Sequence, residues 1–323
     1  MLDLSDPVRQ QLLTLLEDFG NLAATTEVRE RVIALIPAFH ALRKLGTTLV
    51  PEAATAGARE RILTYFLKYP RTIIHTDELM VVSGISDYPR RIRELRVERG
   101  WHLLGGVTAR RMYEAGELDL PGVSAEDIAV MGPDDYVLLS EVQDRDAAHR
   151  WRLANSIRRR TELSGRDRML AYLLENVGRQ VSGEELDYVA KISDWPRRCR
   201  ELRTEEGWQM MTRNSGRPDL PVGMYLLESA EQALPHDRRI PDSVRVEVLQ
   251  RDNNRCRKCQ WTYTEQNPGD PRRLLELHHL DYHSHGGANS TANLITLCNV
   301  HHDDVHREHM SGAEVSAWVE QPG

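Results

Sequence analysis

The residues best suited to chemistry lie toward the C-terminal end of the chain, where cysteines and histidines gather. Cys256 and Cys259 form a Cys-x-x-Cys pair, and Cys298 and His301 form a Cys-x-x-His pair. Sulfur and imidazole ligands in two such pairs are typical of a tetrahedral structural zinc site. A small module with little core of its own needs such a staple. We therefore expect these residues to bind one Zn2+, with buried free thiols as the alternative.

Further histidines lie between and after these pairs. His278 and His279 end an apolar stretch that predicts a strand, and the loop Gly286-Gly287-Ala288-Asn289 follows it. A neutral imidazole can take up a proton near pH 7 and can bind a divalent metal ion. The remaining pieces are the predicted strand Asn293–Cys298 and two histidines spaced to share one helix face, His302 and His306.

This ordered set resembles the HNH (ββα-metal) endonuclease family over about residues 245–306. The pieces follow one another as in the family: a Cys-x-x-Cys, a strand ending in a histidine pair, a Gly-Gly-x-Asn loop, a strand ending in cysteine, and a helix bearing histidines. One departure is His301, where many family members carry a fourth zinc cysteine. Histidine is a competent zinc ligand, so the zinc site is expected to persist.

The resemblance implies a role for each matched residue. His279 corresponds to the general base that deprotonates the attacking water, and Asn293 corresponds to the residue that orients this histidine. His302 corresponds to a ligand of the catalytic metal, and His278 and His306 are expected to complete that site. The histidines without a family counterpart are expected to be loop or surface residues: His283, His285 and His309.

The implied reaction is metal-assisted hydrolysis of a DNA phosphodiester bond. The metal would neutralise the phosphate and stabilise the departing 3′ oxygen. Mg2+ or Mn2+ is the expected catalytic ion, and Ni2+ and Zn2+ stay open for a site rich in imidazole.

The middle of the chain contains an internal repeat, because residues 59–101 align with residues 166–208 without a gap. Each copy predicts an amphipathic helix, a short second helix, and a third helix that starts at a capping residue and a proline. Gly100 and Gly207 predict the end of the third helix, and strand-like apolar segments follow. Three helices followed by a β-hairpin resemble tandem winged-helix DNA-binding domains, such as those attached to some restriction-type nucleases.

The third helix of such a domain commonly enters the major groove, where arginine pairs with guanine. The resemblance implies DNA contacts at this helix start by Tyr88, Arg90, Arg91, Arg93, Trp195, Arg197, Arg198 and Arg200. The alternative for the arginines is a solvated face paired with Glu94, Glu98, Glu201 and Glu205. For Tyr88 and Trp195, stacking on a base competes with packing at a helix start, and packing is the favoured interpretation. Some winged helices bind protein instead.

The predicted fold class is α+β with several domains. A helical segment over residues 1–56 has helices near 6–19 and 26–45, and it packs either on the repeats or on a second subunit. The predicted winged-helix domains cover 57–141 and 164–229. Residues 142–163 are expected to form a basic linker or helix that either follows phosphates or is solvated. A linker over 230–242 precedes the nuclease domain, which is expected over 243–323.

The composition fits a DNA enzyme more closely than a general DNA-coating protein. The net charge of -7 excludes a uniformly basic binder, although local basic clusters still allow DNA binding. No apolar run approaches the roughly 20 residues of a membrane span, and the first residues lack the features of a secretion signal. We therefore expect a cytoplasmic protein with no membrane partner.

Site-reading domains joined to a nuclease predict a sequence-specific endonuclease of restriction type that acts on double-stranded DNA. Dependence on base methylation is an open alternative, because the sequence does not tell whether a methylated base is required or forbidden. One HNH module cuts one strand at a time, so a homodimer is expected. The alternatives are a nicking or homing-type nuclease of a mobile element or phage, and a DNA-binding regulator with a disabled nuclease.

Overall fold

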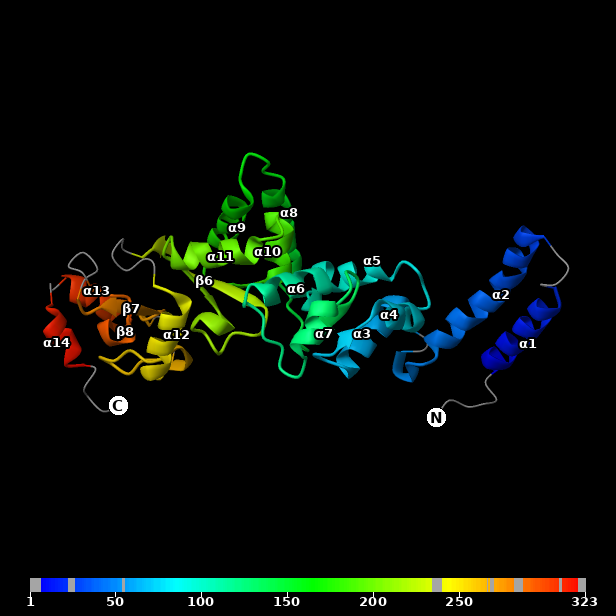
Figure 1. Cartoon of the computed structure of the whole chain (residues 1–323), viewed down its shortest axis with the longest axis horizontal. Coiled ribbons are helices and arrows are strands. Elements are labelled where there is room, and N and C mark those ends of the chain that lie inside the picture. Colours follow the sequence, from blue (N-terminus) through cyan, green and yellow to red (C-terminus); the bar gives the residue numbers. More distant parts are fainter. Residues whose placement is uncertain are drawn as a thin grey trace. The chain divides into compact units, whose positions relative to one another are not determined.

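The protein has a mixed α/β, multidomain architecture, and the computed structural model describes residues 7–22, 27–53, 56–233, 240–265, 267, 270–281, 287–307 and 310–318. Figure 1 labels its helices and strands. The chain divides into two compact units, one of residues 1–110 and 120–151 and the other of residues 111–119 and 152–323. Among the described residues, no helix combines the length and apolar character needed to cross a membrane.

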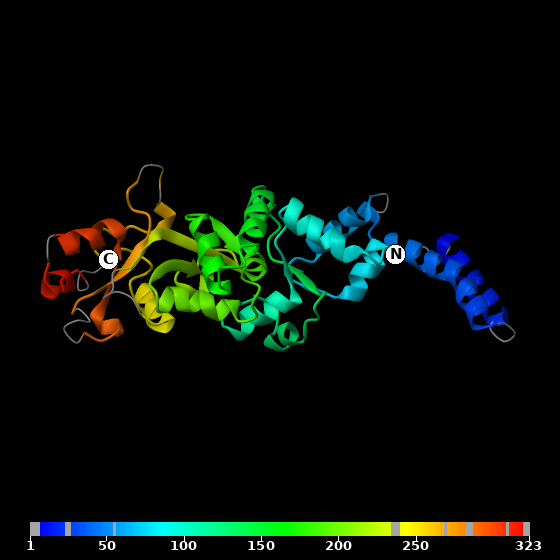
Figure 2. The ribbon, with the colours of Figure 1, turned by 90° about the horizontal axis from the view of Figure 1, so that it is seen from above.

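The first unit starts with a hairpin of α1 (Pro7–Leu22) and α2 (Val28–Thr47), which lie side by side in both views (Figures 1 and 2). Both predicted N-terminal helices are confirmed. The buried residues of α2 are small: Ala38, Ala41 and Gly46. A Cβ at Gly46 would lie 2.4 Å from the carbonyl oxygen of Val81, so this glycine lets α2 approach α4 (Thr76–Ser83) closely.

A separate face of α2 exposes large apolar side chains. Five of them are between 40% and 68% exposed: Val28, Val32, Leu35, Phe39 and Leu42. They are spaced alternately four and three residues apart, which is the pattern of one side of a coiled coil. Beside this face lies an apolar groove of about 780 Å³, which Leu13, Met80 and Ile85 help to line.

The first repeat consists of helices around a three-stranded antiparallel sheet in the order β1-β3-β2. Val137 of the central strand lies opposite Ile73 on one side and Leu104 on the other. Its core includes Ile62, Phe66, Leu79, Ile92 and Leu95. In chain order its elements are η1 (Pro51–Ala53), α3 (Ala58–Lys68), β1 (Ile73–Ile74), α4, α5 (Tyr88–Arg93), η2 (Glu94–Glu98), β2 (Leu103–Gly105), α6 (Gly106–Glu114), α7 (Ala125–Val130) and β3 (Tyr136–Leu138). Helices α6 and α7 form the insertion predicted for this copy.

The second repeat has the same sheet order, β4-β6-β5. Trp195 and Tyr225 pack edge to face in its core, with ring centroids 5.7 Å apart. Its elements are α9 (Gly165–Leu174), β4 (Gln180–Ser182), α10 (Gly183–Ala190), α11 (Trp195–Thr204), β5 (Trp208–Thr212), η3 (Arg213–Ser215) and β6 (Met224–Gln232). Gly100 and Gly207 have φ of 69° and 76°, which confirms that each ends a third helix.

Matched residues of the two repeats make matched hydrogen bonds. Arg61 donates to the carbonyl oxygens of Val82 and Ser83, and Arg168 donates to those of Val189 and Ala190. The tyrosine hydroxyl one turn later donates to a glutamate in the second helix: Tyr65 to Glu78 at 2.6 Å, and Tyr172 to Glu185 at 3.1 Å. These residues therefore join the first and second helices of each copy.

One feature of the repeats differs from the sequence predictions. Strands β1 and β4 were not expected, because two or three residues directly before a helix start are too few to show strand alternation. The segment 142–163, predicted as a basic linker or helix, contains helix α8 (Ala147–Arg158), so the helical alternative is confirmed. Arg150 of this helix is buried and lies 2.5 Å from Asp144.

The nuclease region is organised around a hairpin of β7 (Leu275–His279) and β8 (Leu294–Cys298). Leu277 lies opposite Thr296, and the core includes Trp261, Leu275, Leu297 and Val305. The other elements are α12 (Asp242–Arg251), η4 (Tyr263–Glu265), η6 (Thr291–Asn293), α13 (Asn299–Arg307) and α14 (Gly312–Ser316).

The nuclease region and the second repeat share one compact unit. Arg203 of α11, 1% exposed, lies 2.5 Å from Asp242 at the start of α12 and 3.0 Å from Glu117. The linker predicted over 230–242 is corrected at both ends, because β6 runs through Gln232 and α12 begins at Asp242. Residues 234–239 lie outside the described part of the chain.

Candidate metal centres and nuclease site

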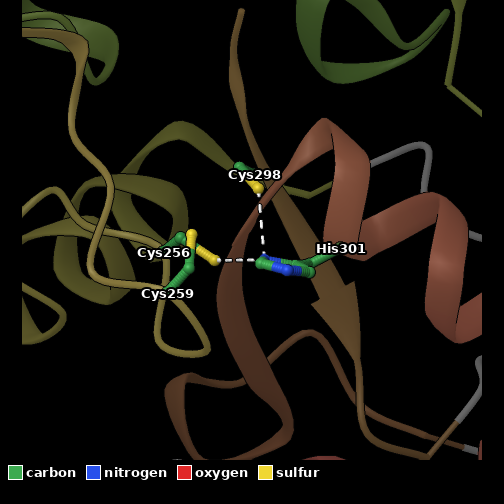
Figure 3. Close-up of side chains that lie close together, drawn as sticks. All are labelled: Cys256, Cys259, Cys298 and His301. Atoms are coloured by element: carbon green, nitrogen blue, oxygen red, sulfur yellow. Dashed lines mark hydrogen bonds between the residues drawn. The ribbon is translucent and has the colours of Figure 1, made fainter. Parts of the chain in front are cut away.

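The two predicted zinc half-sites come together as one centre (Figure 3). The ligand atoms of Cys256, Cys259, Cys298 and His301 all lie within 4.8 Å of one another. His301 Nδ1 is 3.4 Å from the sulfurs of both Cys256 and Cys298. Three sulfurs and one imidazole nitrogen form a donor set that suits tetrahedral Zn2+.

Local backbone geometry positions each of these ligands. After α12 the chain turns through Asn253, Asn254 and Gln260, whose φ angles are 55°, 54° and 61°. Gln260 N–H donates to the carbonyl oxygen of Cys256 at 2.8 Å, which closes the turn around the first cysteine pair. The second pair spans the end of β8 and the first turn of α13.

The contact between Cys256 and Cys298 favours a thiolate, which is the metal-binding form of cysteine, at one of the two residues. A hydrogen bond from Cys298 lowers the pKa of the Cys256 thiol, and the same bond raises the pKa of Cys298. Arg272 lies 3.9 Å from the sulfur of Cys259 and brings a positive charge to the edge of the site.

A second group that could hold a metal ion consists of His278, His302 and His306, whose ligand atoms also lie within 4.8 Å of one another. The ring centroids are 4.6 Å apart for His302 and His306, and 5.4 Å and 4.9 Å apart for their pairs with His278. His278 comes from β7, and the other two come from one face of α13. The structure thus brings together the residues predicted to hold the catalytic ion.

The donor chemistry of this group fits a divalent transition metal. The Nε2 atoms of His302 and His306 face each other at 3.4 Å. Imidazole nitrogen suits ions such as Ni2+ and Zn2+, whereas Mg2+ prefers oxygen ligands. A set of three histidines also leaves coordination positions for water and phosphate oxygen.

His279 lies on the other face of β7 from His278, because successive strand residues point to opposite sides. It is fully buried, and its Nε2 lies 2.8 Å from the side-chain oxygen of Asn289. The neighbouring histidines are therefore separated by the strand itself, one with the metal group and the other held by the loop after β7.

Asn293, which the resemblance predicts to orient His279, makes hydrogen bonds to the main chain. It accepts a hydrogen bond from the backbone N–H of Asp281 and donates to the carbonyl oxygens of Asp281 and Ala288. Its amide thus joins Asp281, just after β7, to Ala288, the neighbour of Asn289. The orienting role of Asn293 stays a prediction.

Two residues near the histidines were missed in the sequence. Asn289 was noted only as part of a loop motif, and nothing in its spacing links it to His279. Glu276 lies 3.4 Å from His302. The alternation of β7 could have revealed Glu276, because it stands two residues before His278 and shares its face.

The predicted DNA-reading arginines lie at the starts of α5 and α11. The side chains of Arg90 and Arg197 are 66% and 72% exposed. Glu94 lies 2.7 Å from Arg91 and 3.4 Å from Arg90, and Glu201 takes the same position beside Arg197 and Arg198. Arg93 is exposed and Arg200 is partly exposed. The pairing with Glu94 and Glu201 expected of a solvated face is therefore present.

Tyr88 and Trp195 are removed from the predicted DNA-binding set. They are 3% and 0% exposed, so neither ring can stack on a base without unpacking its repeat. The packing interpretation of these aromatic residues is confirmed. Four residues noted in the sequence lie outside the described part of the chain: His283, His285, Gly286 and His309.

Comparison with protein families gives two matches. Residues 256–308 match the HNH endonuclease family, and residues 59–139 and 166–228 match the KpnI N-terminal domain. The two segments of the second match coincide with the two copies of the internal repeat. Comparison with curated proteins and with solved structures gives no significant match. The chain therefore carries an HNH endonuclease domain behind a KpnI-type N-terminal region, an arrangement consistent with an HNH restriction-like nuclease.

Proposed function

We propose that this protein is a sequence-specific DNA endonuclease of restriction type that hydrolyses phosphodiester bonds at its HNH site. One observation carries the proposal: three histidines converge on a metal site in the matched HNH segment, next to a buried histidine whose ring is fixed by Asn289. This arrangement supplies both a place for a metal-bound phosphate and a group that accepts a proton.

In this proposal the residues divide the work of hydrolysis. His278, His302 and His306 hold a divalent ion, which when bound neutralises the phosphate and stabilises the departing 3′ oxygen. His279 takes the proton of the attacking water. Asn289 fixes the imidazole ring of His279, and Asn293 fixes the loop. The zinc centre holds β8 and α13 in place beside them.

We propose that the two repeats act as winged helices and choose the cleavage site. Their order of helices and strands and their sheet orders β1-β3-β2 and β4-β6-β5 suit that fold. Helices α5 and α11 take the position of the groove-reading helix, and Arg90 and Arg197 stand exposed at their starts. On binding, guanine and phosphate oxygens would replace Glu94 and Glu201 as partners of these arginines.

We also propose that the protein acts as a homodimer, because two active sites are needed to cut both strands. The exposed stripe of α2, which consists of Val28, Val32, Leu35, Phe39 and Leu42, suits a helix of the same kind. A contiguous apolar surface of this kind commonly marks an interface. A second copy of α2 is the occupant that also meets the need for a second active site.

Cleavage of supercoiled plasmid by the purified protein with Mn2+ or Mg2+ tests the proposal. We expect linear DNA with defined ends, and the metal-free control should stay supercoiled. Open circles alone would support the nicking alternative, whereas binding without cleavage would support the regulator. Plasmid from methylating and non-methylating hosts would show whether methylation is required or forbidden.

A further inference from the structure

We infer that Glu276 is a positioning residue for the nuclease metal site, and that Gln209 of the second repeat holds Glu276 in place. The inference rests on the proposed function of the three-histidine group. It adds a connection between a repeat and the nuclease, through three side chains in contact: Gln209, Glu276 and His302.

The contact between Glu276 and His302 is the first step. Glu276 Oε2 lies 3.4 Å from His302 Nδ1, while His302 Nε2 faces His306 within the metal group. The ring of His302 thus points one nitrogen at a carboxylate and the other at the metal position. A carboxylate in this place fixes the tautomer and direction of a metal-binding histidine and raises its basicity.

The contact between Gln209 and Glu276 is the second step. Gln209 Nε2 donates to Glu276 Oε1 at 3.0 Å, so the two carboxylate oxygens contact different domains. Gln209 is 8% exposed and the side chain of Glu276 is 19% exposed. Their hydrogen bond is therefore largely shielded from water, which strengthens it relative to an exposed contact.

The position of Gln209 gives this contact a consequence. Gln209 lies in β5, which directly follows α11 and its terminal Gly207. A movement of α11 when the protein binds DNA would therefore also move Gln209, and through its hydrogen bond the Glu276 side chain. A cavity of about 510 Å³, which Gln209, Glu276, His302 and Asn299 help to line, lies beside these side chains and leaves them room to move.

Manganese binding to the full chain tests the inference, with free Mn2+ followed by electron paramagnetic resonance. The chain is first dialysed against a mild chelator until one Zn2+ per molecule is left, so that zinc does not fill the three-histidine site. Mn2+ is a harder ion than Zn2+ and leaves the thiolate site to zinc. We expect Glu276→Ala to weaken Mn2+ binding about 10–100-fold, and Glu276→Gln, which keeps an acceptor oxygen, to weaken it less. Gln209→Leu should weaken Mn2+ binding severalfold. This variant does not alter residue 276 itself, but it removes the hydrogen-bond donor that fixes the Glu276 carboxylate.

Asp303→Asn is the matched control, since it removes a charge beside His302 at an exposed position of the same cavity. It should leave Mn2+ affinity within about twofold of the unmodified chain. Zinc content and thermal melting should stay unchanged in all variants. Unaltered Mn2+ affinity in both Glu276→Ala and Gln209→Leu would overturn the inference alone. Absence of Mn2+ binding by the unmodified chain would overturn the metal centre, and the inference with it.

Discussion

One peptide unit separates His278, which joins the metal group, from His279, which is held by Asn289. The pleat of β7 sends the two rings to opposite faces, so adjacent residues of the same type lie in different surroundings. The resemblance to the HNH family predicts a different role for each. It could not predict that Asn289 would contact His279, because the fold of a loop decides that contact.

We expect His279→Ala to lower the rate of plasmid nicking at least about a hundredfold, because water activation is lost. DNA binding, zinc content and thermal melting should stay unchanged. His149→Ala, at an exposed histidine of α8, is the matched control and should cleave normally. Near-normal nicking by a folded His279→Ala protein would remove this histidine from the mechanism.

Asn293 shows what a sequence resemblance leaves open about a residue. Its amide joins Asp281 and Ala288 through hydrogen bonds to the main chain. The resemblance predicted that Asn293 orients His279, but it could not predict these main-chain partners, because they depend on the three-dimensional fold.

At the scale of elements, the group of three cysteines and His301 brings together the turn after α12, the end of β8 and the start of α13. We expect Cys256→Ser to lose the tightly held zinc and to lower the melting temperature of the protein, because structural zinc supplies folding energy. His301→Cys keeps a complete ligand set and should retain zinc. Metal analysis after dialysis against a mild chelator would decide this, and retention of zinc by Cys256→Ser would contradict the assignment.

The third helices of the two repeats, α5 and α11, are predicted to determine the cleavage site. Arg90→Ala and Arg197→Ala should relax the choice of cleavage site, since one arginine–guanine contact is worth about 1–3 kcal/mol of discrimination. Nicking at high enzyme concentration should persist. Arg179→Ala, at an exposed position away from these helices, is the control. Cut ends mapped on a long DNA give the readout, and unchanged ends in both arginine variants would show that the repeats do not read the site.

The elements also show what sequence patterns can reveal. The ungapped repeat predicted two copies of one fold, and their shared hydrogen bonds explain part of that identity: Arg61 and Arg168 join the same helices in each copy. Strands β1 and β4 escaped notice because they are too short for a periodic signal. A helix was one of the two alternatives for residues 142–163, but the ion pair that buries Arg150 could not be read from composition.

At the scale of the whole molecule, the nuclease is not a freely tethered module. Arg203→Ala should destabilise the second unit by about 3–5 kcal/mol, because it leaves buried Glu117 and its neighbour Asp242 without this partner. Arg197→Ala lies on the same helix at an exposed position and should have little effect. Chemical denaturation provides the measurement, and equal stability of the two variants would contradict a structural role for Arg203.

The proposed association of two chains also belongs to the scale of the whole molecule. Leu35→Glu together with Phe39→Glu should convert a dimer into a monomer, because two charges would enter the apolar stripe. The monomer should still nick DNA but should make linear products more slowly. Val130→Glu, at an isolated valine that is 77% exposed, is the control. Sedimentation of the unmodified chain as a monomer at working concentration would contradict the proposed dimer.

The near-identity of the starts of α5 and α11 has a consequence for the base sequence of the recognition site. Arg90 and Arg91 of one copy correspond to Arg197 and Arg198 of the other. Each pair directly follows a proline at the start of its helix. If both helices read DNA as proposed, two recognition helices with the same arginines should prefer the same short base sequence. Each chain would then contact one short base motif twice, and a pair of chains would contact it four times. The recognition site should therefore consist of repeats of a single motif.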